Sequence, residues 1–164
     1  MAPHKFTDHV AARGRPIEFA NIAERFFGLL RPVSVDEEVA EDLYSFGYTL
    51  YKQDRFVEAS TVFQYLLLCS KLHPRTTMAL GACCQAQMNY ETGALLYQFS
   101  MDLGGNDPAL HLYLGECLIY IGKELEAILE LKLAIQLTSG SPEKIDVFEK
   151  ASGLITLLEN ADHA

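Results

Sequence analysis

The stretch LYSFGYTLY, residues 43–51, decides the fold because the glycine at its centre is repeated along the chain. Gly47 returns as Gly81 and again as Gly115, at equal steps of 34 residues. Three further series keep the same step: Phe46, Leu80 and Leu114; Ala59, Gly93 and Ala127; Pro74, Pro108 and Pro142. Four coincident series indicate three tandem copies of one structural unit.

The unit has the pattern of a tetratricopeptide repeat (TPR), which is a hairpin of two helices. A large residue followed by Gly, a small residue twelve positions later and Pro at the boundary are typical of this repeat. The register places the repeats at 40–73, 74–107 and 108–141. Small residues at Gly47 and Ala59 let the two helices approach closely, and we assign Phe46, Leu50 and Phe63 to the core between them.

The flanking segments complete a single all-α domain over residues 16–164, after a flexible leader at 1–15. An apolar segment at 16–31 is predicted to form an N-terminal helix, and residues 142–160 a helix that caps the last repeat. Three tandem TPR hairpins between these helices should coil into a superhelix with a concave groove. The N-terminal helix carries an extra apolar edge, which makes it a candidate for a homodimer contact.

Composition argues against several function classes. The formal net charge of −9 opposes binding to nucleic acid or to anionic membranes, and no apolar run is long enough to insert into a bilayer. The four cysteines include no Cys-x-x-Cys pair, so we expect no metal site. Without a phosphate loop or a nucleophile elbow we expect no enzyme and no cofactor. Cys83 and Cys117 follow their repeat glycines by two residues and are expected to be buried thiols, while a redox role of the adjacent pair Cys83 and Cys84 is left open.

The groove is where a ligand would bind, and its lining follows from the repeat register. Groove-facing positions should lie one residue after the repeated Gly and about one helical turn to either side. Tyrosines there offer apolar rings with hydroxyl groups, which suit a hydrophobic peptide. These tyrosines could instead be ordinary core, but the core stripe is already assigned. The selected residues are Tyr44, Tyr48 and Tyr51 in repeat one, Met78, Ala82 and Gln85 in repeat two, and Leu112, Glu116 and Ile119 in repeat three.

The stretch at 43–51, with RFVEA at 55–59 and LGACCQA at 80–86, resembles the translocator (class II) chaperones of bacterial type III secretion systems. The resemblance implies a bacterial cytoplasmic protein that binds hydrophobic, pore-forming translocators and keeps them soluble, separate and competent for secretion. It implies that an extended segment of proline-x-leucine-x-x-proline type occupies the groove, at Tyr44, Tyr51, Phe56 and Tyr97, with Tyr48 beside them. Dimerisation through the N-terminal region is a further implication.

A second function remains open at this stage. TPR hairpins also serve as adaptors that scaffold other complexes, or as chaperones for a secreted effector instead of a translocator. The sequence does not name or count the clients, and it does not show whether the groove is open in the free protein.

Overall fold

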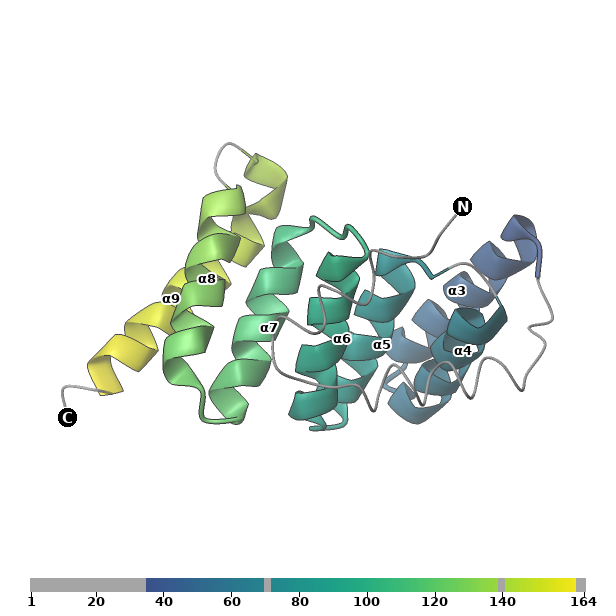
Figure 1. The fold of residues 1–164 in the computed structure, drawn as a ribbon, viewed down its shortest axis with the longest axis horizontal. Helices are drawn as coiled ribbons and strands as arrows, with labels where there is room; N and C mark the ends of the chain where they lie inside the picture. The colour runs from purple at the N-terminus through teal and green to yellow at the C-terminus, as the bar shows by residue number, and fades with distance from the viewer. Residues whose placement is uncertain (1–34, 70–71, 139–140, 162–164) are drawn as a thin grey trace, which may run out of the picture. The chain divides into compact units, whose positions relative to one another are not determined.

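The computed structural model describes residues 35–69, 72–138 and 141–161, and within these ranges every regular element is a helix (Figure 1). The predicted leader at 1–15 and the predicted helix at 16–31 lie outside the described residues. The elements are α3 (Glu37–Lys52), α4 (Phe56–Cys69), α5 (Pro74–Ala86), α6 (Tyr90–Asp102), α7 (Pro108–Tyr120), α8 (Glu124–Thr138), a 3-10 turn (Pro142–Lys144) and α9 (Ile145–Ala161).

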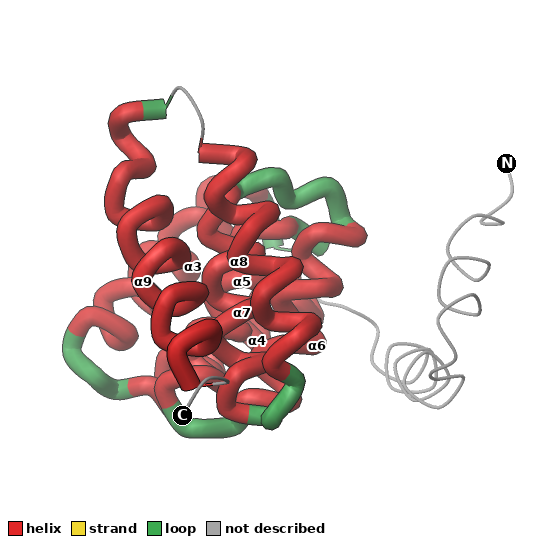
Figure 2. The backbone as a smooth tube through the Cα atoms, turned by 90° about the vertical axis from the view of Figure 1, so that its left-hand side faces the viewer, coloured by secondary structure: helices red, strands yellow, loops and turns green. Residues whose placement is uncertain are grey.

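The helices of residues 35–161 pack in chain order as three hairpins, α3 with α4, α5 with α6, and α7 with α8. Each hairpin packs on the next through α4 with α5 and α6 with α7, and α9 packs on α8. Figure 2 shows the short turns at the helix ends. The all-α class and the tandem TPR hairpins with a C-terminal helix are therefore confirmed. None of the described helices is long and apolar enough to cross a bilayer.

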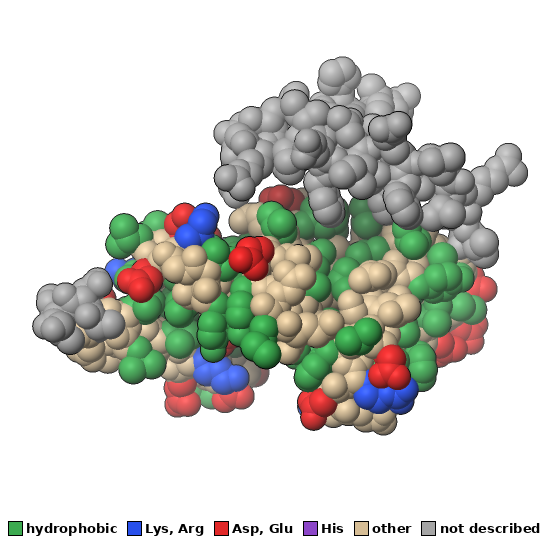
Figure 3. Space-filling view, turned by 90° about the horizontal axis from the view of Figure 1, so that it is seen from below, with side chains coloured by type: hydrophobic (Ala, Val, Ile, Leu, Met, Phe, Trp, Pro, Cys, Tyr) green, Lys and Arg blue, Asp and Glu red, His purple; other side chains and the backbone are tan. Residues whose placement is uncertain are grey.

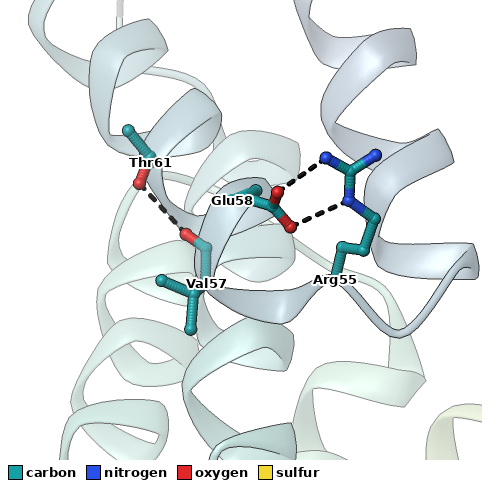
Figure 4. A network of polar contacts seen from close by, with 4 residues as sticks. All are labelled: Arg55, Val57, Glu58 and Thr61. Carbon is teal, nitrogen blue, oxygen red and sulfur yellow. Dashed lines mark hydrogen bonds and ion pairs between the residues drawn. The ribbon is translucent and has the colours of Figure 1, made fainter.

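Local chemistry at the helix ends explains where the helices begin. The Asp36 side chain accepts a hydrogen bond from Val39 N at 2.9 Å, and Asp107 does the same for Ala109 N at 3.1 Å. These bonds satisfy backbone donors that a first turn leaves unpaired. At the start of α4, Arg55 donates from Nε and Nη2 to the Glu58 carboxylate at 2.8 and 2.6 Å (Figure 4).

The turn inside each hairpin contains one residue in the left-handed region. These residues are Asp54 (φ 58°), Met88 (φ 59°) and Gly122 (φ 78°), and they occupy the same repeat position. Only the third turn uses glycine, which adopts this conformation without strain. Figure 3 views the described helices from this end, where hydrophobic side chains reach the surface between scattered charged ones.

The repeated glycine is required by a large side chain from the second helix of each hairpin. A Cβ at Gly47 would lie 2.9 Å from the Phe63 ring, one at Gly81 would lie 2.9 Å from the Tyr97 ring, and one at Gly115 would lie 2.9 Å from Leu131. Phe63, Tyr97 and Leu131 are all fully buried. The predicted close approach at Gly47 is confirmed, and the same packing recurs in all three repeats.

Phe46 does not belong to the core, contrary to the sequence assignment. Its side chain is 55% exposed, whereas Leu80 and Leu114 at the same repeat position are 6% and 5% exposed. The difference in exposure follows from the preceding helix. Leu80 lies on α5, which packs on α4, and Leu114 lies on α7, which packs on α6. Within the described ranges no helix precedes α3. Among the described helices, this position is therefore covered by a preceding helix in the second and third hairpins but not in the first.

Candidate functional site: the tyrosine face

The first helices of the three hairpins carry the candidate residues on one side. Because α5 contacts both α3 and α7, equivalent positions on these helices are neighbours in space. Tyr48, Ala82 and Glu116 share one repeat position, and none of the three is buried. We call this side of α3, α5 and α7 the tyrosine face; the small side chain of Ala82 separates the aromatic residue of α3 from the acidic residue of α7.

Three tyrosines of α3 contribute to the face in different ways. Tyr48 is the most accessible, with half of its surface exposed, while Tyr44 and Tyr51 are half-buried. The Tyr51 ring meets the Phe56 ring edge-on, with centroids 5.3 Å apart. This contact places Phe56 beside the face, as a side chain that orients Tyr51.

Tyr44 is held on two sides. Its ring lies 5.4 Å from that of Phe63, centroid to centroid, and the Arg75 guanidinium stands 3.8 Å above the ring centre. Arg75 is itself paired with Glu41. A cation over an aromatic face is attracted by the ring quadrupole. Tyr44 is therefore a fixed aromatic surface with only part of its ring available to a ligand.

Two residues predicted to line the groove lie in the core instead. Tyr97 fills the space beside Gly81 and is fully buried, because it is the repeat-two equivalent of Phe63. Leu112 is fully buried in the cluster that joins α7 to α8 and α9, together with Leu131 and Ile155. Neither side chain presents a surface to a ligand in this structure.

The sequence analysis missed Tyr113, which is half-buried on α7 with its ring centroid 5.6 Å from that of Tyr97. Burial raises the pKa of Tyr113, and the nearby Glu116, Asp107 and Tyr48 raise it further. The equivalent positions hold Ser45 and Ala79, so no repeated aromatic residue marks this position.

Gln85 and Glu116, both predicted groove residues, are joined in one polar network. The Tyr97 hydroxyl donates to Gln85 Oε1 at 2.7 Å, and Gln85 Nε2 donates to Glu116 Oε2 at 2.7 Å. The other predicted residues of these two helices, Met78 and Ile119, are half-buried and pack against the core cluster of α6 and α7.

Cys69, Cys83 and Cys117 are buried, as expected for Cys83 and Cys117, while Cys84 is half-buried. Burial raises the pKa of Cys83 and of Cys117 to about 12, and it also raises the pKa of Cys84. Reactive cysteines typically have a lowered thiol pKa, which is the opposite of the shift that burial causes here. Over the described ranges, no group of three or more His, Cys, Asp or Glu residues is placed to hold a metal ion.

The chain is similar in sequence to a known bacterial protein. No family model matches the chain. Low calcium response locus protein H of Yersinia pseudotuberculosis is 26% identical over 125 residues, which cover 76% of this chain and 74% of the relative.

Two crystal structures of one chaperone share the fold. The type III secretion translocator chaperone SycD of Yersinia enterocolitica, solved as an alternative dimer, superposes with a TM-score of 0.74 at 26% identity, covering 79% of this chain and 98% of SycD. SycD in complex with a peptide of the translocator YopD gives a TM-score of 0.73 at 26% identity, covering 77% of this chain and 97% of SycD. The homologues of this chain are therefore translocator chaperones of type III secretion systems.

Proposed function

We propose that the chain is a bacterial cytoplasmic chaperone that binds hydrophobic translocator proteins of a type III secretion system. The observation that carries this proposal is the similarity to SycD in complex with a translocator peptide, over 77% of this chain. An extended segment of the client occupies the tyrosine face, which keeps the client soluble, separate from other translocators and competent for secretion. The proposal needs no catalytic step and no cofactor.

The chemistry of the tyrosine face supports an apolar peptide ligand. Tyr48 offers an accessible ring, and Tyr44 and Tyr51 are held in place by Phe63, Arg75 and Phe56. Rigid aromatic side chains bind with little loss of conformational entropy, and they dominate many binding interfaces. The net charge of −9 opposes self-association of a complex that carries an aggregation-prone client.

Homodimer formation is part of the proposal, since SycD has been solved as a dimer. The predicted contact through the N-terminal helix at 16–31 lies outside the described residues and stays a prediction. Its direct measure is the molar mass of the purified chain in solution.

Co-expression with a hydrophobic translocator tests the function. We expect the client to stay soluble and to co-purify with the wild-type chain. The double variant Tyr48→Ala with Tyr51→Ala should lose the client. Tyr65→Ala is the matched control, because Tyr65 is an exposed tyrosine on α4, which does not contribute to the tyrosine face. Equal recovery of the client by all three proteins would disprove binding at this face. Recovery of a secreted effector and no translocator would favour the alternative function.

A further inference from the structure

Glu116 is the charged member of its repeat position, where the other two repeats have Tyr48 and Ala82. The half-buried carboxylate lies on the same face as the α3 tyrosines, and it contributes to the raised pKa of both Tyr97 and Tyr113. A carboxylate in partly aromatic surroundings loses part of its hydration. A partly desolvated carboxylate on a peptide-binding face is stabilised when a bound ligand supplies a hydrogen-bond donor or a positive charge.

The carboxylate is held in a defined orientation by a chain of two hydrogen bonds. Tyr97 is fixed by packing beside Gly81, and its hydroxyl donates to Gln85 Oε1 at 2.7 Å. With its oxygen accepting that bond, the Gln85 amide directs its NH₂ group at Glu116 Oε2, also at 2.7 Å. The buried tyrosine of α6 thus sets the position of an acceptor on α7.

Among the partners that the described residues offer, only Gln85 donates a side-chain hydrogen bond to the Glu116 carboxylate. The ion pairs in the described part of the chain involve five other carboxylates, those of Glu41, Glu58, Asp107, Glu126 and Glu130. Within residues 35–69, 72–138 and 141–161, Glu116 has no cationic partner. A carboxylate has about four acceptor sites, and the bond from Gln85 uses one of them.

We propose that Glu116 selects client segments in which a Lys or Arg accompanies the apolar side chains that the α3 tyrosines bind. This inference rests on the proposed function and adds a specificity determinant to it. Every extended segment offers backbone N–H groups, so these cannot discriminate between segments. A basic side chain can, because a charge-assisted bond to a carboxylate is about twice as strong as a neutral one.

As a consequence of this arrangement, the two ends of the tyrosine face differ in chemistry. Aromatic surface lies on α3 and negative charge on α7, with Ala82 of α5 between them. A segment whose basic residue follows its apolar residues fits in one chain direction only. Glu116 thereby sets both the composition and the orientation of the bound segment.

Two synthetic peptides of proline-x-leucine-x-x-proline type, identical except for Lys or Met at one variable position, test the inference, and a third peptide carries Glu at that position. Binding to the full chain is followed by fluorescence anisotropy at low and at high salt. We expect the wild-type chain to prefer the Lys peptide about tenfold at low salt. Glu116→Gln should abolish the preference, and Glu116→Lys should reverse it toward a peptide with Glu at that position. Glu126→Gln, which removes an exposed carboxylate on α8, should keep it.

Equal affinity of the wild-type chain for both peptides would overturn the inference and leave the proposed function intact. The same holds if Glu116→Gln retains the full preference while its circular dichroism matches that of the wild type. If neither peptide binds but a translocator still co-purifies with the chain, the inference is wrong and the proposed function stands. If co-purification fails as well, both are wrong.

Discussion

The Phe63 ring occupies the space beside Gly47, so that a Cβ at residue 47 would lie 2.9 Å from Phe63 Cε1. This distance is well inside van der Waals contact. The two residues come from the two helices of the first hairpin, and Phe63 is buried on all sides. The close approach of α3 and α4 therefore depends on the absence of a side chain at residue 47.

Replacing Gly47 with Val should destabilise the protein by about 2–3 kcal/mol, because overpacking forces a buried ring to move. The matched control is Gly153→Val, since a Cβ at Gly153 meets no atom within 4 Å. Gly153 lies inside α9, so the control should change stability by less than about 0.5 kcal/mol. Urea unfolding followed by circular dichroism measures both variants. Equal losses for the two would contradict the packing described for the hairpin.

Leu80→Ala and Phe46→Ala should differ sharply although the two residues share a repeat position. Leu80 is buried between α4 and α5, so its truncation should cost about 2–5 kcal/mol. Phe46 is 55% exposed, so its truncation should cost less than about 1 kcal/mol. Thermal unfolding compares the two variants. A loss at Phe46 as large as that at Leu80 would show that Phe46 is covered in solution.

Tyr97→Phe should preserve the packing beside Gly81, because Phe63 already fills the equivalent space in repeat one. Loss of the bond to Gln85 should lower stability by only about 1 kcal/mol. The variant should also weaken the preference for a Lys peptide, because the orientation of Gln85 is no longer fixed. Peptide binding and unfolding are measured on the same preparation. A variant that loses stability but keeps the full Lys preference would assign Tyr97 a purely structural role.

The buried thiols predict a loss of stability at alkaline pH. The pKa of Cys83 and of Cys117 is about 12 in the folded chain, above the value of about 9 for a free thiol. The unfolded state therefore releases these protons first, and the free energy of unfolding should fall as the pH rises from about 9 toward 12. The double variant Cys83→Ala with Cys117→Ala should show a shallower fall between pH 9 and 10 than the wild type, because the tyrosines, whose ordinary pKa is about 10, contribute equally to both proteins. An unchanged slope would mean that the two thiols titrate normally.

The hairpin architecture was predictable because the sequence pattern that specifies it repeats every 34 residues. Gly47, Gly81 and Gly115 each face a large residue, and this pairing depends only on contacts inside one hairpin. Burial of a single side chain was harder to predict, because it depends on which hairpin lies next to it. Phe46 and Leu80 show this directly, since within the residues that the structure describes a helix precedes α5, which carries Leu80, and none precedes α3, which carries Phe46.

The candidate site was predicted less completely, since one residue step around a helix turns a side chain by about 100°. On α7 this step separates Leu112, which is buried, from Tyr113, which is half-buried near the tyrosine face. Tyr97 was assigned to the groove from a family resemblance, whereas its place is set by the glycine beside it. Which side chains α3, α5 and α7 present together was therefore visible only from the packed helices.

The left-handed turn at Met88 has a practical consequence for engineering. Met88 adopts a conformation that glycine occupies freely at Gly122, and its side chain is exposed at a hairpin turn. Strain of this kind costs roughly 1 kcal/mol. Glycine or asparagine at residue 88 relieves this backbone strain without changing the tyrosine face. The substitution therefore gives a more stable parent protein for crystallisation and mutagenesis.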